Sequence, residues 1–253
     1  MTQTSKTTRF TSVILTIAVL FSLICTVGAT SANAAVNDRV SLYSSGVTFA
    51  KYGAQTYEIF VKTNDNAHDQ EVYIHYYYMS GMDWEDVKAE YVATLGDGSK
   101  IWKAYLTSYN CEYAIKYVAD GQTFWDNNNG SNYNGTEVIG SAPVSVKRIG
   151  KYYYDLASYP IDVVLQNYAY EKNVFVRYTT DGWNTYTDTA LGYAETNSDG
   201  TETWSGSIDI SSIVANNYNY ADFEYAVCYQ VNGTEYWANY FGNNYDINYS
   251  IHR

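Results

Sequence analysis

The sequence predicts an all-β protein made of two tandem antiparallel β-sandwiches, and three observations support this fold class. Apolar and polar residues alternate with a period of two over short segments, such as residues 174–178 and 223–229. Asx-Gly pairs, which favour hairpin turns, separate such segments. A block of aromatic and amide residues occurs twice. Short strands and hairpin turns without helical periodicity are typical of antiparallel sandwiches.

The clearest strand places Val174, Val176 and Tyr178 on one face, with Phe175 and Arg177 on the other. A second strand has four alternating side chains on one face: Phe223, Tyr225, Val227 and Tyr229. Each pattern predicts a half-buried strand.

The predicted turns recur at fixed offsets. Asp-Gly pairs at 97–98 and 199–200 are 102 residues apart, and Asx-Gly pairs at 120–121 and 232–233 are 112 apart. The second copy therefore carries about ten extra residues, which fall near residues 211–220, and residues 216–220 (NNYNY) are expected to form an exposed loop there. Calcium binding by these loops is the alternative interpretation, but no EF-hand spacing is present.

The repeated block predicts the domain organisation. Residues 124–133 read FWDNNNGSNY and residues 236–245 read YWANYFGNNY, and each block follows a matching strand. We expect one sandwich over residues 35–140 and the other over residues 141–253, with a short linker at Pro143.

The N-terminal segment, residues 1–34, resembles a secretory signal peptide. Lys6 and Arg9 precede an uncharged apolar stretch over residues 10–29, and Ala32-Asn33-Ala34 supplies small residues for cleavage. A membrane anchor is the alternative, because about 20 apolar residues are long enough to span a bilayer. The cleavage triplet favours a cleaved signal peptide and a secreted protein.

The charge balance restricts the class of ligand. The chain has 27 acidic against 15 basic residues, a formal net charge of −12. Binding to nucleic acid or anionic membranes depends on Lys and Arg, so we expect neither partner. An acidic protein of this kind suits a neutral ligand. Thirty tyrosines, with an apolar body and a polar tip, also favour strands and binding surfaces.

No motif for catalysis is present. The three histidines, His68, His75 and His252, form no zinc motif, and there is no nucleophile elbow or phosphate loop. A glycosidase would need two carboxylates roughly 5–10 Å apart in a deep cleft, and small sandwiches leave little material for one. We therefore predict no catalytic residue, no metal and no cofactor, and an enzyme is the third hypothesis.

The repeated block favours sugar binding. Aromatic planes match the apolar face of a pyranose, and Asn amides offer a donor and an acceptor to neighbouring hydroxyls. The structural alternative is that Trp125 and Trp237 cap a sandwich end while the asparagines shape a loop. For Trp102 and Trp204 we favour the core. Trp84 and Trp183 lie in polar surroundings, where an exposed indole indicates function.

The residues then resemble a known family. Residues 167–183 (NYAYEKNVFVRYTTDGW) resemble the N-terminal half of carbohydrate-binding module family 21, the starch-binding domains. Residues 223–237 resemble its C-terminal half, and residues 125–130 (WDNNNG) show its characteristic block. The related starch-binding family 53 uses such a block as well. The resemblance implies immunoglobulin-like β-sandwiches that bind α-glucan at two sites.

The resemblance also implies which residues bind. In the first site, glucose would stack on Trp183 with Trp237, and on Trp84 with Trp125. The hydrogen-bonding partners there would be Asn127, Asn132, Asn239 and Asn244. The second site would use Tyr170, Tyr193, Asn167 and Lys172.

Two departures from the family pattern affect these sites. His68 stands where the second copy has Tyr170. The first copy therefore keeps only one aromatic residue of the second site, Tyr91, which is aligned with Tyr193. The second copy has Ala238-Asn239-Tyr240-Phe241 in place of the Asp-Asn-Asn-Asn run, which removes hydrogen-bonding side chains.

The leading hypothesis is a secreted, non-catalytic binder of α-glucan polysaccharide, namely starch, amylopectin, glycogen and maltooligosaccharides. A separately encoded amylase is a candidate partner. The alternative is a Tyr-rich extracellular adhesin or structural protein that binds a protein partner.

Overall fold

The computed structural model describes residues 38–49, 55–79, 81–109, 112–135, 139–147, 158–216 and 220–250. The predicted signal peptide, residues 1–34, lies outside these residues, as does Cys111. Every pairing between the strands of the described residues is antiparallel, which confirms the predicted fold class.

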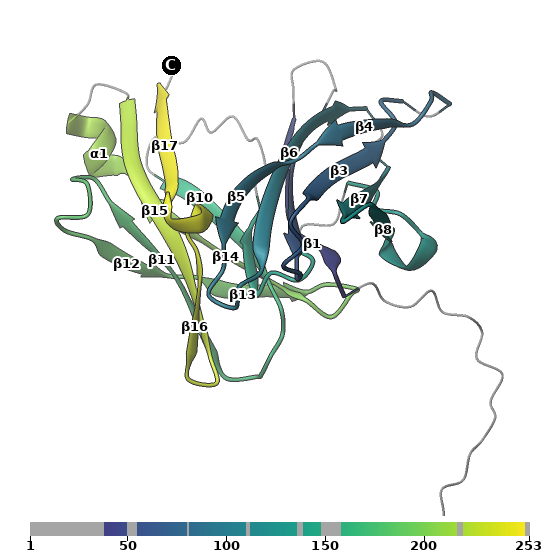
Figure 1. Cartoon of the computed structure of the whole chain (residues 1–253). Helices are drawn as coiled ribbons and strands as arrows, with labels where there is room; N and C mark the ends of the chain where they lie inside the picture. The colour runs from purple at the N-terminus through teal and green to yellow at the C-terminus, as the bar shows by residue number, and fades with distance from the viewer. Residues whose placement is uncertain are drawn as a thin grey trace, which may run out of the picture. The chain divides into compact units, whose positions relative to one another are not determined.

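The first half of the chain forms two four-stranded sheets, with orders β1-β2-β6-β5 and β4-β3-β7-β8 (Figure 1). Its strands are β1 (Val40–Phe49), β2 (Gln55–Thr63), β3 (Gln70–Tyr76), β4 (Glu85–Lys88), β5 (Glu90–Thr94), β6 (Lys100–Ser108), β7 (Tyr113–Ala119) and β8 (Gln122–Asp126). One hydrophobic core, which includes Ile59, Val72, Ile74 and Ile115, takes side chains from both sheets.

The second half repeats this plan. Sheet β13-β14-β10-β9 and sheet β12-β11-β15-β16, to which β17 adds by pairing with β15, enclose a separate core. The strands are β9 (Val144–Val146), β10 (Ser158–Leu165), β11 (Lys172–Thr179), β12 (Thr187–Ala190), β13 (Gly192–Thr196), β14 (Glu202–Asp209), β15 (Tyr220–Val231), β16 (Thr234–Ala238) and β17 (Tyr245–Ser250).

The alternation read from the sequence is present in both halves. In β3, Val72 and Ile74 are fully buried, so their neighbours Tyr73 and His75 point to the opposite face of the sheet. In β11, Val174 and Val176 point into the second core, so Arg177 lies on the outer face. The outer faces of the β3 and β11 sheets therefore carry corresponding residues, and the candidate site lies there.

The hairpin turns follow the Asx-Gly prediction. Both residues of Asp120-Gly121 have positive φ, 48° and 77°, and both residues of Asn232-Gly233 do, 52° and 76°. This is the geometry of a two-residue hairpin turn that glycine and Asx residues tolerate. These turns join β7 to β8 and β15 to β16, the strands that lead into the aromatic–amide blocks.

The extra residues of the second half begin with a short helix, α1 (Ser211–Asn216). Of the loop expected over residues 216–220, residues 217–219 lie outside the described residues. The Asp209 carboxylate starts this helix, because its Oδ1 accepts from the backbone N of Ser211 at 2.9 Å and from Ser211 Oγ at 2.6 Å. No helix within the described residues is long and apolar enough to span a bilayer.

Candidate functional site

Three side chains meet on the outer face of the β4-β3-β7-β8 sheet in the first half. His75 stacks on Trp84, with ring centroids 4.9 Å apart and planes inclined by 16°. Trp125 presents an edge to the same imidazole at 5.3 Å and 75°. Trp84 is 39% exposed and Trp125 is 42% exposed. The two indoles expected in one site therefore flank a histidine that sequence reasoning had not assigned to it.

Strand pairing explains this placement. His75 in β3 lies opposite Asp86 in β4, and Trp84 stands just before β4. On the other side, β7 pairs with β8, which brings Trp125 onto the same face. Neighbouring strands are about 4.8 Å apart, so residues 41 positions apart in the chain share one surface.

Asp86 fixes the imidazole. His75 Nδ1 lies 2.7 Å from Asp86 Oδ1, and Lys116 Nζ donates to Asp86 Oδ2 at 2.7 Å. Partial burial opposes the ionisation of Asp86, but the hydrogen bonds from Lys116 and His75 outweigh it and lower the pKa of the carboxyl. The aspartate is therefore ionised at neutral pH and holds both partners in place.

The second half has the same arrangement with an arginine at its centre. Arg177 in β11 makes two hydrogen bonds of 2.7 Å to the carboxylate of Asp188 in β12. Its guanidinium carbon lies 4.0 Å from the ring centroid of Tyr186 and 5.4 Å from that of Trp237. Trp237 also meets Phe175 edge-on at 5.8 Å. A nitrogen-bearing side chain that contacts two aromatic rings and the aspartate of the neighbouring strand is thus common to both halves.

Trp183, which the family resemblance pairs with Trp237, has a different environment from Trp84. Its backbone adopts φ of 67°, and its indole N donates to Glu224 Oε2 at 2.6 Å. The residue that directly precedes β12, as Trp84 precedes β4, is Tyr186. Sequence reasoning missed Tyr186, although the 102-residue offset of the preceding strands leads from Trp84 to this position.

The asparagines of the two blocks shape the same turn. Asn127 Oδ1 accepts from the backbone N of Gly130 at 3.0 Å, and Asn239 Oδ1 accepts from that of Gly242 at 3.2 Å. The two residues that follow each cap have positive φ, between 50° and 57°. Through these bonds the asparagines shape a loop, as the structural alternative to sugar binding predicts. The second half forms the same turn, although Tyr240 and Phe241 replace two of its asparagines.

Two glutamates that sequence reasoning missed tie these loops to the sheets. Asn132 Nδ2 donates to Glu112 Oε1 at 2.7 Å, and Asn244 Nδ2 lies 3.3 Å from Glu224 Oε2. Glu112 also accepts from the hydroxyl of Tyr77 at 2.9 Å, and Tyr77 meets Trp84 edge-on at 5.1 Å. The signal available in the sequence was that both glutamates open the matching runs before the blocks.

The departure at Ala238 changes how the block is anchored. In the first half, Asp126 Oδ2 accepts from the backbone N of Leu42 at 2.8 Å and from the hydroxyl of Tyr133 at 2.7 Å. In the second half Ala238 is buried in the core, and the next residues make other contacts. The Tyr240 hydroxyl donates to Glu58 Oε1 at 2.5 Å.

The residues of the second predicted site are placed as follows. Tyr170 is 93% exposed and Tyr193 is 57% exposed. The Lys172 side chain is only 1% exposed, and its Nζ donates to Glu202 Oε2 at 2.8 Å and to Asn167 Oδ1 at 2.6 Å. Lys172 is thus held in a buried ion pair with Glu202, and the exposed Asn167 is a second acceptor for it, while the two tyrosines offer aromatic surface.

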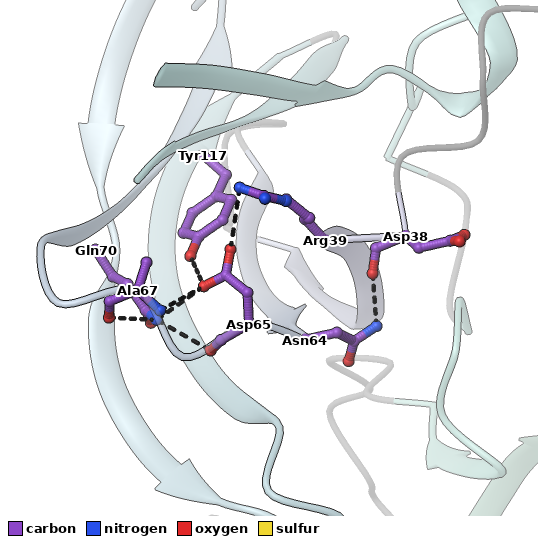
Figure 2. Close-up of polar contacts among 7 residues, drawn as sticks. All are labelled: Asp38, Arg39, Asn64, Asp65, Ala67, Gln70 and Tyr117. Atoms are coloured by element: carbon purple, nitrogen blue, oxygen red, sulfur yellow. Dashed lines mark hydrogen bonds and ion pairs between the residues drawn. The ribbon is translucent and has the colours of Figure 1, made fainter. Parts of the chain in front are cut away.

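The first half has a different cluster at the matching place (Figure 2). Gln70 occupies the position of Lys172, and its Nε2 donates to Asp65 Oδ1 at 3.0 Å and to the Ala67 carbonyl at 2.9 Å. Asp65 also accepts from the Tyr117 hydroxyl at 2.5 Å and pairs with Arg39 at 3.8 Å. This cluster closes the loop that contains His68.

The two remaining tryptophans, the tyrosines that contact them and Cys228 have the following surroundings. Trp102 and Trp204 are partly buried against their cores. Tyr91 meets Trp102 edge-on at 5.8 Å, as Tyr193 meets Trp204 at 6.2 Å. Cys228 is buried and free, and within the described part of the chain no group of three or more His, Cys, Asp or Glu side chains is arranged to hold a metal ion.

Part of the chain is similar to known proteins. Residues 161–248 match the family described as carbohydrate/starch-binding module (family 21). Protein phosphatase 1 regulatory subunit 3B of Bos taurus is 40% identical over 85 residues, which are 34% of this chain and 30% of that protein. Glycogen-binding subunit 76A of Drosophila melanogaster is 34% identical over 86 residues, 33% of this chain and 12% of that protein.

Two solved structures are also similar. The carbohydrate-binding module of the muscle glycogen-targeting subunit of protein phosphatase-1 is 22% identical with a TM-score of 0.35, covering 41% of this chain and 73% of that one. The starch-binding domain of Rhizopus oryzae glucoamylase, in complex with β-cyclodextrin and maltoheptaose, is 23% identical with a TM-score of 0.32, covering 39% and 93%.

The family match confirms the resemblance over residues 161–248, in the second half of the chain. The matched stretch spans 30% or less of the length of the two curated relatives named above. The comparisons contradict the predicted secretion: the curated relatives are named as regulatory subunits of protein phosphatase 1 and as a glycogen-binding subunit, which points to an intracellular rather than a secreted protein. The apolar N-terminal segment had suggested export, but that segment lies outside the matched region.

Proposed function

Because residues 161–248 match the carbohydrate/starch-binding module of family 21, we propose that this chain is a non-catalytic protein that binds starch- or glycogen-like α-glucan in both of its halves. The observation that supports this most directly is the pair of half-exposed indoles, Trp84 and Trp125, held on either side of His75. Flat aromatic surface beside loop amides suits the apolar face and the hydroxyl rim of a glucose unit.

Binding in the first half rests on Trp84 and Trp125 as stacking surfaces. Asn127 and Asn132 lie in the adjoining loop, and the amide hydrogens not used within the loop are the donors proposed for sugar hydroxyls. Each stacking contact contributes on the order of 1 kcal/mol, by analogy with aromatic pairs. One half alone is then a weak binder.

In the second half, the equivalent surface consists of Trp237 and Tyr186 around Arg177, with Trp183, Asn239 and Asn244 beside it. We place Tyr170 and Tyr193 at a second surface, where their exposed rings stack on glucose. Lys172, which is buried against Glu202 and donates to the exposed Asn167, supports that surface together with Asn167. Two weak halves on one polymer gain avidity of about 10²–10⁴-fold over one half.

Retention on granular starch, with crystalline cellulose as the comparison, tests this function. We expect the full chain to bind starch selectively and a Trp84→Ala/Trp125→Ala/Tyr186→Ala/Trp237→Ala variant to lose retention. Tyr105→Ala is the matched control, because Tyr105 is 53% exposed but lies on β6, in the other sheet of the first half. Retention no greater than that of an inert protein would refute the proposal.

A protein partner is the second candidate, favoured by the relatives that are named as regulatory subunits of protein phosphatase 1. Binding to a protein need not depend on Trp84 or Trp237, so the same variants separate the two functions. An amylase that acts on the bound glucan is a further candidate partner. Release of reducing sugar from soluble starch by the pure protein would contradict the non-catalytic role.

A further inference from the structure

The residue at the centre of each aromatic platform differs between the halves, but its surroundings compensate for the difference. Here a platform means the rings of Trp84 and Trp125 around His75, or those of Tyr186 and Trp237 around Arg177. Both central residues occupy the same strand position, since His75 pairs with Asp86 and Ala114 while Arg177 pairs with Asp188 and Ala226.

Each aspartate has one permanently charged partner, but this cation comes from a different strand in each half. In the first half, Lys116 supplies this cation from β7 at 2.7 Å from Asp86. In the second half, Cys228 occupies the place of Lys116 and is fully buried. There the cation comes from Arg177 itself, at 2.7 Å from Asp188.

We propose that His75 and Arg177 are positioning residues of the two glucan platforms. Each is tied to the aspartate of the neighbouring strand and thereby holds its aromatic rings in the binding orientation. Arg177 both packs on the rings and supplies the cation for the aspartate, two roles that His75 and Lys116 divide between them in the first half. This inference rests on the proposed function. His75 covers one face of Trp84 and leaves the remaining half-exposed surface of that indole for sugar.

The physical reason for a positioning effect is conformational. A free indole on a loop must lose rotamer freedom when a sugar stacks on it, and this costs affinity. A ring already packed against an imidazole or a guanidinium, which is itself tied to an aspartate, has lost that freedom before binding. The expected effect of removing the central residue is therefore a two- to tenfold loss of affinity, about the cost of ordering one side chain.

The test uses the full chain with the second platform disabled by Trp237→Ala, and maltoheptaose as the probe. In this background we expect His75→Ala to weaken binding by about two- to tenfold, with little change in the melting temperature. The double variant His75→Arg/Lys116→Ala, which copies the second half, should restore most of the affinity. Lys116→Ala alone is the matched control for the rescue.

A second readout does not need a ligand. The indole N–H resonance of Trp84, identified by its loss in Trp84→Phe, should shift in His75→Ala and return toward its parental position in the double variant. Affinity unchanged in His75→Ala, or a double variant no better than His75→Ala, would overturn the inference. If the Trp237→Ala background protein itself fails to bind maltoheptaose, the proposed function fails. In that case the positioning role is judged by the resonance alone, and a Trp84 resonance that does not shift in His75→Ala overturns it.

Discussion

His75 lies almost parallel to Trp84, at 4.9 Å and 16°, while its nitrogen Nδ1 points to Asp86 at 2.7 Å. The imidazole thus connects the aromatic surface to the charged pair formed by Asp86 and Lys116. The exposed rings of the first half are therefore packed against a side chain that is itself hydrogen-bonded to a charged pair, unlike exposed rings that make no such contacts.

The exposed indoles should be needed for glucan binding but not for stability. Trp84→Ala and Trp125→Ala each remove one stacking surface worth on the order of 1 kcal/mol, about a fivefold loss of affinity for maltoheptaose. Isothermal titration in the Trp237→Ala background measures this loss. Tyr105→Ala should leave the affinity unchanged, and an equal loss in that control would show that the effect is not specific to the platform.

The two roles of Asn127 can be separated by a nearly isosteric change. Asn127→Asp keeps an oxygen that accepts from the backbone N of Gly130 but removes the amide donors. We expect the melting temperature to stay close to that of the parent while starch retention falls. Asn127→Ala removes both functions and should also destabilise the loop, by about 0.5–2 kcal/mol for a lost cap. Unchanged retention in Asn127→Asp would leave Asn127 with the loop-forming role alone.

Breaking the buried pair of Lys172 and Glu202 should unfold the second half more easily. The Lys172 side chain is 1% exposed and that of Glu202 is 11% exposed, so Lys172→Met leaves a buried carboxylate without its cation. We expect a loss of about 3–5 kcal/mol in the free energy of unfolding, measured with urea.

The exposed pair of Lys88 and Glu71, with side chains 58% and 45% exposed, provides the control, and Lys88→Met should change stability little. The double variant Lys172→Met/Glu202→Met should recover much of the loss, because no buried charge is left unpaired. A Lys172→Met protein as stable as the Lys88→Met protein would contradict this account.

The same pair predicts a loss of stability in acid. Partial burial would raise the pKa of Glu202, but hydrogen bonds from Lys172 and Trp204 outweigh it and hold the pKa below its ordinary value of 4.5. A depressed folded-state pKa stabilises the protein above the unfolded value, and this stability is lost as the pH falls from 4.5 through the folded pKa.

We therefore expect the melting temperature to fall as the pH is lowered below 4.5, and the fall to be shallower in Glu202→Gln. Differential scanning calorimetry over that range checks this. Parallel curves for the parent and Glu202→Gln would show that Glu202 is not one of the groups responsible.

Local sequence determined the strands, the turns and the repeat, because each depends on residues that are near neighbours in the chain. The alternation of Val174 and Val176 with Phe175 sets which face is buried, and Asn232-Gly233 tolerates the positive φ of a tight turn. The family pattern likewise identified Trp84, Trp125 and Trp237 as candidate binding residues.

Only the tertiary structure decided which of these residues become neighbours. Period-two alternation assigns a side chain to a face, but the register between strands decides what lies beside it. Register places His75 next to Asp86, and it makes Tyr186 the counterpart of Trp84 in the second half. Burial of Lys172 beside Glu202 also depends on the pairing of distant strands, so a lysine that the family resemblance implied for the second site is part of a buried ion pair.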